Sequence, residues 1–200
     1  MLFITIFIVG IIAFLLIANV KSISGQVIYV RSTLDGNQYL VKNLADKQQS
    51  ADLLAWLAKQ MQALVDHLKS HQSDTDYANY KKAITLLVNR FNPRNISENG
   101  NNGGNYTTFT LNKGQNVSFC LRTRDANNQL HADKNMLLFV AIHEMAHIAS
   151  IAEDPNHKTE EFKSNFKFLY DTAIKVGVYQ YDDYRANPKR YCNTTINTTP

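Results

Sequence analysis

The feature that most constrains the fold is the pentapeptide HEMAH at residues 143–147, which follows an uninterrupted apolar run over residues 136–142. An apolar run that continues into such a pentapeptide predicts a buried helix. On a helix, residues four apart share a face, so His143 and His147 can bind one cation while Glu144 projects beside it. Uncompensated His and Glu side chains on a buried helix are costly, which favours a functional site over a chance pattern.

The pentapeptide has the HExxH arrangement, in which two histidines bind Zn²⁺ and the glutamate is the general base. Zinc keeps a fourth position for water and lowers the pKa of that water to about 7. Glu144 is then placed to take the proton of the water. We therefore expect a zinc-dependent endopeptidase that acts on protein or peptide substrates, with Zn²⁺ as cofactor and Glu144 as the catalytic residue.

A third protein ligand must come from outside the motif, because two histidines do not complete a catalytic zinc site. His157 lies ten residues after His147, beyond a helix break at Pro155, where a chain reversal can return it to the metal. Glu153 is the alternative, six residues after His147. The acids at 160–161 are further candidates.

The first 20 residues contain no charged side chain. A helix of that length spans a hydrocarbon core of about 30 Å. The missing basic n-region favours an uncleaved anchor over a cleavable signal, so residues 2–20 are expected to make a single-pass protein of a host or viral membrane. The side of the membrane stays open. Lys21 and Arg31 weakly favour a cytoplasmic body, whereas five glycosylation sequons and two cysteines point the other way.

Length and charge indicate the domain organisation and the kind of partner. We expect a transmembrane anchor over 1–20, a juxtamembrane segment with a weak hairpin signal over 21–48, and a metallopeptidase domain over 49–200. The net charge is +4 and the basic residues are scattered, so no nucleic-acid partner is expected. Nothing in the sequence indicates the oligomeric state.

Apolar periodicity predicts helices around a small sheet. The expected helices are 50–70, 77–91, the motif helix capped by Asp133 or Asn135, and 160–176. The motif helix should end by Glu153-Asp154-Pro155, because Pro155 cannot continue it. Ser50 and Thr159 are the expected N-caps of the first and last. Two strand-like runs, 106–111 and 117–121, predict a small antiparallel hairpin beside the motif helix. The expected class is therefore α+β and mostly helical.

Two further sets of side chains have open roles. Cys120 and Cys192 are the only cysteines, and either a disulfide or two buried thiols is consistent with their spacing. Tyr170, Tyr184 and Tyr191 are candidate hydrogen-bond donors to a tetrahedral intermediate, and their spacing selects none of them.

The chain resembles the membrane-anchored metallopeptidases of large cytoplasmic DNA viruses, which are related to SprT/WLM-type zincins. The resemblance is carried by the segments DGNQYLV (35–41), ADLLA (51–55), RFNPRNISE (90–98), NKG (112–114), FCLRTR (119–124), FVAIHEMAH (139–147), EFKSNFKFL (161–169) and YC (191–192). It covers most of residues 35–192 and implies a mini-zincin fold with bound zinc. It also implies that the histidine shortly before Glu161-Phe162 is the third ligand, which is His157. Both cysteines lie within matching segments, which favours their pairing.

Two other functions compete with the peptidase. One is a non-catalytic, zinc-stabilised structural or interaction protein of a membrane or virion. Glu144 argues against it, because a structural site needs no base. The other is a DNA-linked protease, by analogy with SprT and WLM proteins. The predicted anchor and the absence of a basic run argue against that function.

Overall fold

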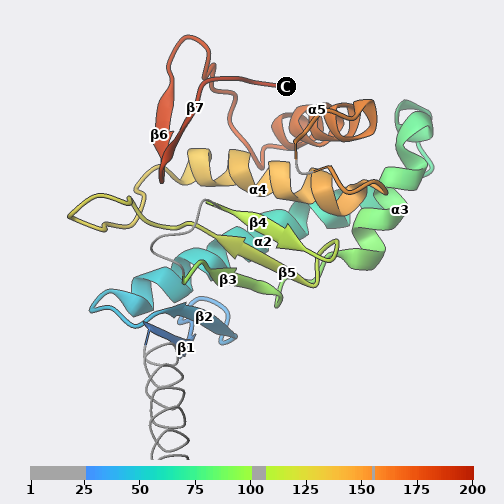
Figure 1. Ribbon diagram of the computed structural model, residues 1–200. Coiled ribbons are helices and arrows are strands. Elements are labelled where there is room, and N and C mark those ends of the chain that lie inside the picture. The colour runs from blue at the N-terminus through green and yellow to red at the C-terminus, as the bar shows by residue number, and fades with distance from the viewer. Residues whose placement is uncertain (1–25, 101–106, 155) are drawn as a thin grey trace, which may run out of the picture.

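The computed structural model describes residues 26–100, 107–154 and 156–200 and has an α+β arrangement (Figure 1). Its centre is α4 (Lys134–Ala149), the helix that carries the HEMAH pentapeptide. A three-stranded sheet lies on one side of α4, and α5 (Glu160–Lys175) lies on the other (Figure 1). The motif helix therefore runs between two layers of structure.

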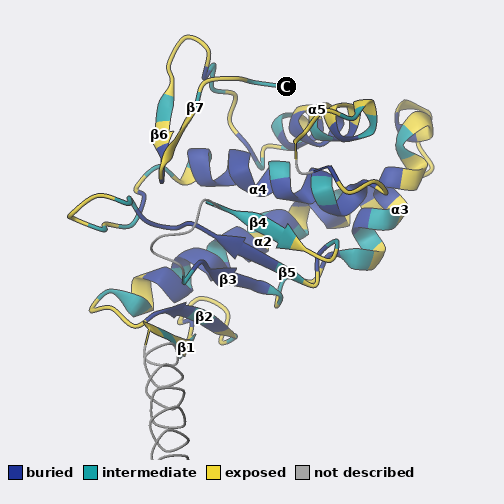
Figure 2. Ribbon diagram, in the orientation of Figure 1, coloured by how far each residue is buried: buried dark blue, intermediate teal, exposed yellow. Residues whose placement is uncertain are grey.

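Burial along α4 is nearly continuous, as the apolar run predicts, and most of the helix is dark blue in Figure 2. The helix begins after Asp133, whose carboxylate accepts a hydrogen bond of 2.9 Å from the Met136 amide. This is one of the two predicted caps, and it satisfies an amide left without a partner in the first turn. The helix ends at Ala149, before Glu153, as predicted.

The predicted start of α5 is confirmed. The Thr159 hydroxyl accepts a hydrogen bond of 3.2 Å from the Phe162 amide, which is the bond of an N-cap. The helix predicted over 77–91 has two parts, the 3₁₀ helix η1 (Thr75–Tyr80) and α3 (Lys81–Arg90).

The first long helix, α2 (Lys47–Ser70), begins before Ser50, so the prediction that Ser50 caps it is wrong. Ser50 lies buried inside the helix, and its hydroxyl accepts a hydrogen bond of 2.7 Å from Arg122 Nη2. The residue at the cap position is Asp46. Its two carboxylate oxygens each accept a hydrogen bond of 2.7 Å from Arg122, so the side chain does not bond the helix amides.

The central sheet has the order β3-β5-β4. The strands β4 (Phe109–Leu111) and β5 (Asn116–Phe119) are antiparallel, as the hairpin pattern predicts. A third strand, β3 (Ile96–Glu98), pairs in parallel with β5, so the sheet is mixed and the expectation of a purely antiparallel sheet is wrong. In this sheet β4 is an edge strand, and it contacts α4.

A second hairpin pairs β1 (Val27–Arg31) with β2 (Gln38–Lys42) in antiparallel register. It is fastened through the buried carboxylate of Glu98. One oxygen accepts a hydrogen bond of 2.8 Å from the Lys42 amide, and the other accepts one of 2.7 Å from Arg122 Nε. Arg122 also bonds Ser50 within α2 and Asp46 just before it, so one guanidinium joins this hairpin, the central sheet and α2. A buried ion pair needs such additional hydrogen bonds to offset its desolvation.

The C-terminal part forms a third hairpin, β6 (Lys189–Tyr191) with β7 (Thr194–Ile196), which the sequence pattern does not predict. Between its strands, Cys192 forms a disulfide with Cys120, which directly follows β5. The two cysteines are separated by 72 positions in the sequence. The bridge therefore attaches the C-terminal hairpin to the central sheet across a long stretch of chain.

We expect the Cys120→Ala/Cys192→Ala double variant to lose about 2–4 kcal/mol in free energy of unfolding, because the bridge restricts a long loop in the unfolded chain. Urea denaturation of the oxidised parent and the double variant measures this difference. Reduction of the parent should lower its midpoint to that of the variant. Equal midpoints for oxidised parent and variant would show that the bridge does not stabilise the fold.

The expected transmembrane helix requires a correction. Within the ranges that the structure describes, no helix is both long and apolar enough to cross a membrane. α4 is mostly apolar, but its 16 residues rise only about 24 Å. The longer α2 carries Asp52, Lys59 and Asp66. The assignment as a single-pass membrane protein is therefore not supported. The predicted anchor over 1–20 lies outside the described residues.

Candidate metal centre

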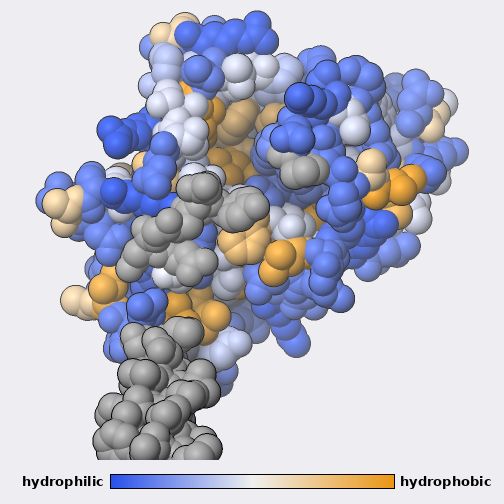
Figure 3. Space-filling model, in the orientation of Figure 1, coloured by the Kyte–Doolittle hydropathy of each residue, from blue (hydrophilic) through white to orange (hydrophobic). Residues whose placement is uncertain are grey.

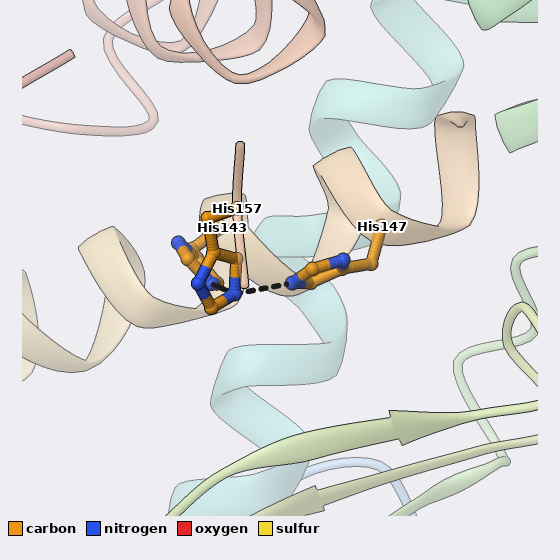
Figure 4. A group of neighbouring side chains, drawn as sticks. All are labelled: His143, His147 and His157. Atoms are coloured by element: carbon orange, nitrogen blue, oxygen red, sulfur yellow. Dashed lines mark hydrogen bonds between the residues drawn. The ribbon is translucent and has the colours of Figure 1, made fainter. Parts of the chain in front are cut away.

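Three histidine side chains meet beside the C-terminal half of α4 (Figure 4). His143 and His147 are one turn apart on the helix, and His157 comes from the loop between α4 and α5. The Nε2 atom of His157 lies 3.1 Å from that of His143 and 3.0 Å from that of His147. Nitrogens bound at about 2.0–2.1 Å to a tetrahedral zinc ion lie about 3.3 Å apart. The two distances from His157 are close to this value, and the ligand nitrogens of all three histidines lie within 4.8 Å of one another, so the cluster can hold a zinc ion.

The electrostatics of the cluster also suit a metal. Burial, followed by the charges of His147 and His157, lowers the pKa of His143 to about 3. Burial and the neighbouring His157 lower the pKa of His147 to about 4, and burial lowers that of His157. At neutral pH all three imidazoles are therefore uncharged, which is the form that donates a lone pair to Zn²⁺.

The loop that carries His157 is held by Asp154. Its carboxylate accepts hydrogen bonds from the Lys158 amide (3.1 Å), the Thr159 amide (2.7 Å) and the Thr159 hydroxyl (2.8 Å). Burial opposes ionisation of Asp154, but these bonds outweigh it and lower its pKa to about 2. His157 itself has a φ of 55°, a left-handed conformation that is uncommon for a residue with a side chain. A tight, hydrogen-bonded turn thus returns the third imidazole to the helix.

Two cations bind carbonyl groups at and just after the end of α4. Arg90 Nη1 donates to the carbonyls of Ile148 and Ser150, both at 2.9 Å. Lys113 Nζ donates to the Ala152 carbonyl at 2.6 Å and lies 3.4 Å from the His147 carbonyl. Carbonyls at a helix C-terminus need such partners, and cations there also complement the helix dipole. These bonds therefore satisfy carbonyl groups at the helix end and hold the chain that follows it.

The general-base candidate, Glu144, is only 4 % exposed. Its Oε2 accepts a hydrogen bond of 2.7 Å from the Thr110 hydroxyl on the edge strand β4. Burial raises the pKa of Glu144 to about 7, and the Thr110 bond partly opposes the rise. A buried carboxyl group whose pKa lies near neutrality is a candidate for proton transfer.

The acidic alternatives to His157 lie apart from the histidine cluster. The Glu153 side chain is 81 % exposed, and its carboxylate is 3.7 Å from Lys113 Nζ. Glu160 pairs with Lys163 at 2.7 Å. The Glu161 carboxylate accepts from the amides of Ile151 and Ala152, at 2.9 and 3.2 Å, and so fixes the loop after α4.

The histidines and Glu144 open into a cleft of about 820 Å³. Its walls are β4, α4, the first half of α5, and the chain from Thr194 to Pro200. Of the three tyrosines considered as donors, Tyr191 lines this cleft, and its hydroxyl is hydrogen-bonded to the Thr108 hydroxyl. The buried ring of Phe162 packs against all three imidazoles, with centroid distances of 5.1, 4.4 and 5.0 Å to His143, His147 and His157.

Sequence reasoning does not identify Thr110, Lys113, Arg90 or Phe162 as parts of the site. The sequence gives a weak indication for Thr110. Alternate residues of a strand point to one face, so Thr108 and Thr110 are expected to share a face. The contacts of Arg90 and Lys113 join residues 34–60 positions apart, and no local pattern reports them.

Comparisons with known proteins give viral relatives. The chain is 35 % identical over 176 residues to the uncharacterized protein R325 of Acanthamoeba polyphaga mimivirus, which covers 88 % of this chain and 85 % of R325. It is 31 % identical over 112 residues to the uncharacterized protein 136R of Invertebrate iridescent virus 6, covering 56 % of this chain and 60 % of 136R. It is 37 % identical over 86 residues to the uncharacterized protein 042R of Invertebrate iridescent virus 3, covering 43 % of this chain and 49 % of 042R. No family model and no solved structure matches. The extent of the first match shows that this chain belongs to the same protein family as mimivirus R325.

Proposed function

We propose that the protein is a zinc-dependent peptidase, in which His143, His147 and His157 hold the ion and Glu144 is the general base. The observation that supports this most is the meeting of three uncharged imidazoles in the cleft that also contains the Glu144 carboxylate, with the Nε2 atom of His157 3.1 and 3.0 Å from those of His143 and His147. A site with only a structural role needs ligands but no buried carboxyl group beside them.

Each of these residues would have a separate role in peptide hydrolysis. Bound zinc supplies a Lewis acid that polarises the scissile carbonyl and acidifies water. Glu144 accepts a proton from the attacking water and later gives it to the leaving amine. The Thr110 hydroxyl donates to Oε2 and so orients the carboxylate, which leaves Oε1 for the proton. The raised pKa of Glu144, about 7, suits a group that must first accept and then release a proton near neutral pH.

The edge strand β4 offers a binding site for an extended substrate. β4 borders the cleft and is an edge strand of its sheet. An extended peptide can add to such an edge by main-chain hydrogen bonds, as in β-strand addition. Because the side chain of Thr110 reaches Glu144 from this strand, a peptide docked along β4 passes close to the base.

Zinc content and zinc-dependent cleavage test the proposal on the full-length protein. We expect stoichiometric zinc by elemental analysis and hydrolysis of unfolded proteins such as reduced casein. Treatment with 1,10-phenanthroline should abolish hydrolysis, and added Zn²⁺ should restore it. A zinc-loaded protein that cleaves none of a broad panel of unfolded proteins and peptides would instead favour a zinc-stabilised scaffold.

A further inference from the structure

One part of the cleft is apolar and lies next to the metal centre. Phe139 and Val140 on α4 precede His143 by about one turn, and Phe166 projects from α5. The Phe166 ring lies 5.1 Å from the ring of His143 and 5.5 Å from that of Phe139. Ile196 on β7 lines the cleft from the C-terminal hairpin and, like Phe166, is only partly buried. Figure 3 shows this hollow between the β6–β7 hairpin and α5, with hydrophobic atoms in orange at its floor.

The charged residues beside this hollow are already paired. Lys163 and Lys167 line the cleft, but Lys163 pairs with Glu160 at 2.7 Å and Lys167 pairs with Asp171 at 3.1 Å. These are exposed pairs within one helix, and each lysine has an acid neighbour on α5 itself. The rim therefore provides little net attraction for an acidic ligand. Contacts with the apolar floor should then determine which ligands bind most tightly.

The chain after Cys192 gives the hollow a polar wall. Thr194, Thr195, Asn197 and Thr198 line the cleft together with Ile196. Hydroxyl and amide groups on this wall can hydrogen-bond the main chain of a ligand, while the aromatic floor receives a side chain. An apolar floor with a few polar groups at its margin is the usual make-up of a site that selects a ligand by one buried group.

We propose that the hollow formed by Phe139, Val140, Phe166 and Ile196 is a specificity subsite that takes a large apolar side chain, aromatic or branched aliphatic, of a peptide bound in the cleft. The inference rests on the proposed peptidase function for the nature of the ligand. Beyond that function, the inference says which peptides the cleft selects. It also assigns Ile196, which lies outside the metal centre, as a specificity-determining residue.

Binding to a catalytically silent protein tests the subsite without turnover. The zinc-loaded, full-length Glu144→Gln variant is titrated with fluorescently labelled Ala-Ala-Ala-Xaa-Ala-Ala peptides in which Xaa is Phe, Leu, Ala, Asp or Lys, and anisotropy gives the dissociation constants. We expect the Phe and Leu peptides to bind roughly 10–100-fold more tightly than the Ala, Asp and Lys peptides, the range for burial of one apolar side chain.

Variants of Ile196 locate the effect. Both variants are made in the Glu144→Gln background. Ile196→Trp should fill the hollow, so that the Phe peptide binds less than about threefold more tightly than the Ala peptide. Ile196→Ala should enlarge the hollow, so that the Phe peptide binds more tightly than the Leu peptide. Ile28→Trp is the matched control, because Ile28 is a partly exposed strand residue on the distant β1–β2 hairpin (Figure 1). It should leave the whole series unchanged.

The outcomes separate this inference from the proposed function. Equal binding of all five peptides, no binding of any, or the same loss in the Ile196→Trp and Ile28→Trp proteins would overturn the subsite. Selective binding of Phe and Leu peptides supports the subsite even if the parent protein cleaves nothing, which would count against the peptidase alone. Cleavage by the parent protein without any apolar preference would retain the peptidase and reject the subsite.

Discussion

Replacing Glu144 by Gln is expected to reduce peptide hydrolysis by about 10²–10⁴-fold, the range for loss of general acid–base catalysis. Glutamine has nearly the shape of glutamate, and its carbonyl oxygen can still accept the hydrogen bond from Thr110, but it cannot take a proton. The fold and the zinc content should therefore be unchanged. Initial rates on a peptide that the parent cleaves, measured at equal zinc occupancy, give the reduction.

Glu153→Gln is the matched control for this experiment. Glu153 also lines the cleft, but its side chain is exposed and outside the histidine cluster. The control should retain nearly the full rate. If the parent and Glu144→Gln proteins cleave a panel of unfolded proteins equally well, or both cleave none, the catalytic role of Glu144 fails.

Replacing His157 by Ala is expected to remove most of the zinc at neutral pH. The loss of one of three protein ligands should weaken binding by more than about 100-fold, since even partners that only orient a ligand are worth about 10–100-fold. The variant should stay folded, because the His157 side chain is on the exposed side of the cluster and Asp154 holds its loop through main-chain and Thr159 bonds. Competition with a chromophoric chelator measures the zinc affinity.

The Glu153→Ala protein is the control for metal binding and should keep stoichiometric zinc. The reverse pattern, with zinc retained in His157→Ala and lost in Glu153→Ala, would assign the third ligand to Glu153. Circular dichroism of both variants shows whether a loss of metal reflects the ligand or the fold.

Local rules predict the helices and the motif well. The α4 and α5 helices follow from an apolar run or stripe together with Asp133 and Thr159 at their caps, all of which are visible within a few residues of sequence. His143 and His147 share a face by helical spacing alone. The position of His157 depends on a turn whose bonds come from Asp154, and the sequence predicts only that the chain reverses near Pro155.

The features that the sequence does not predict depend on contacts with residues that are far apart in the sequence. β3 carries Glu98, a residue depleted in strands, and it is buried there because Arg122 from another part of the chain pairs with it. Ser50 is of a residue type that often caps helices, but α2 already begins at Lys47, and the Ser50 hydroxyl bonds Arg122, which is distant in sequence. β6 and β7 are short strands, so they have too few residues to show alternation.

The Cys120–Cys192 bridge also affects how the integrity of the chain must be assayed. Both α4 and α5, and therefore all three histidines, lie within the segment that the bridge closes. The exposed turn at Asp125–Asn127 lies in the same segment, and such turns are preferred sites of proteolytic nicking. A chain that is cut there by a protease stays covalently joined and migrates as one species until a reductant separates the pieces.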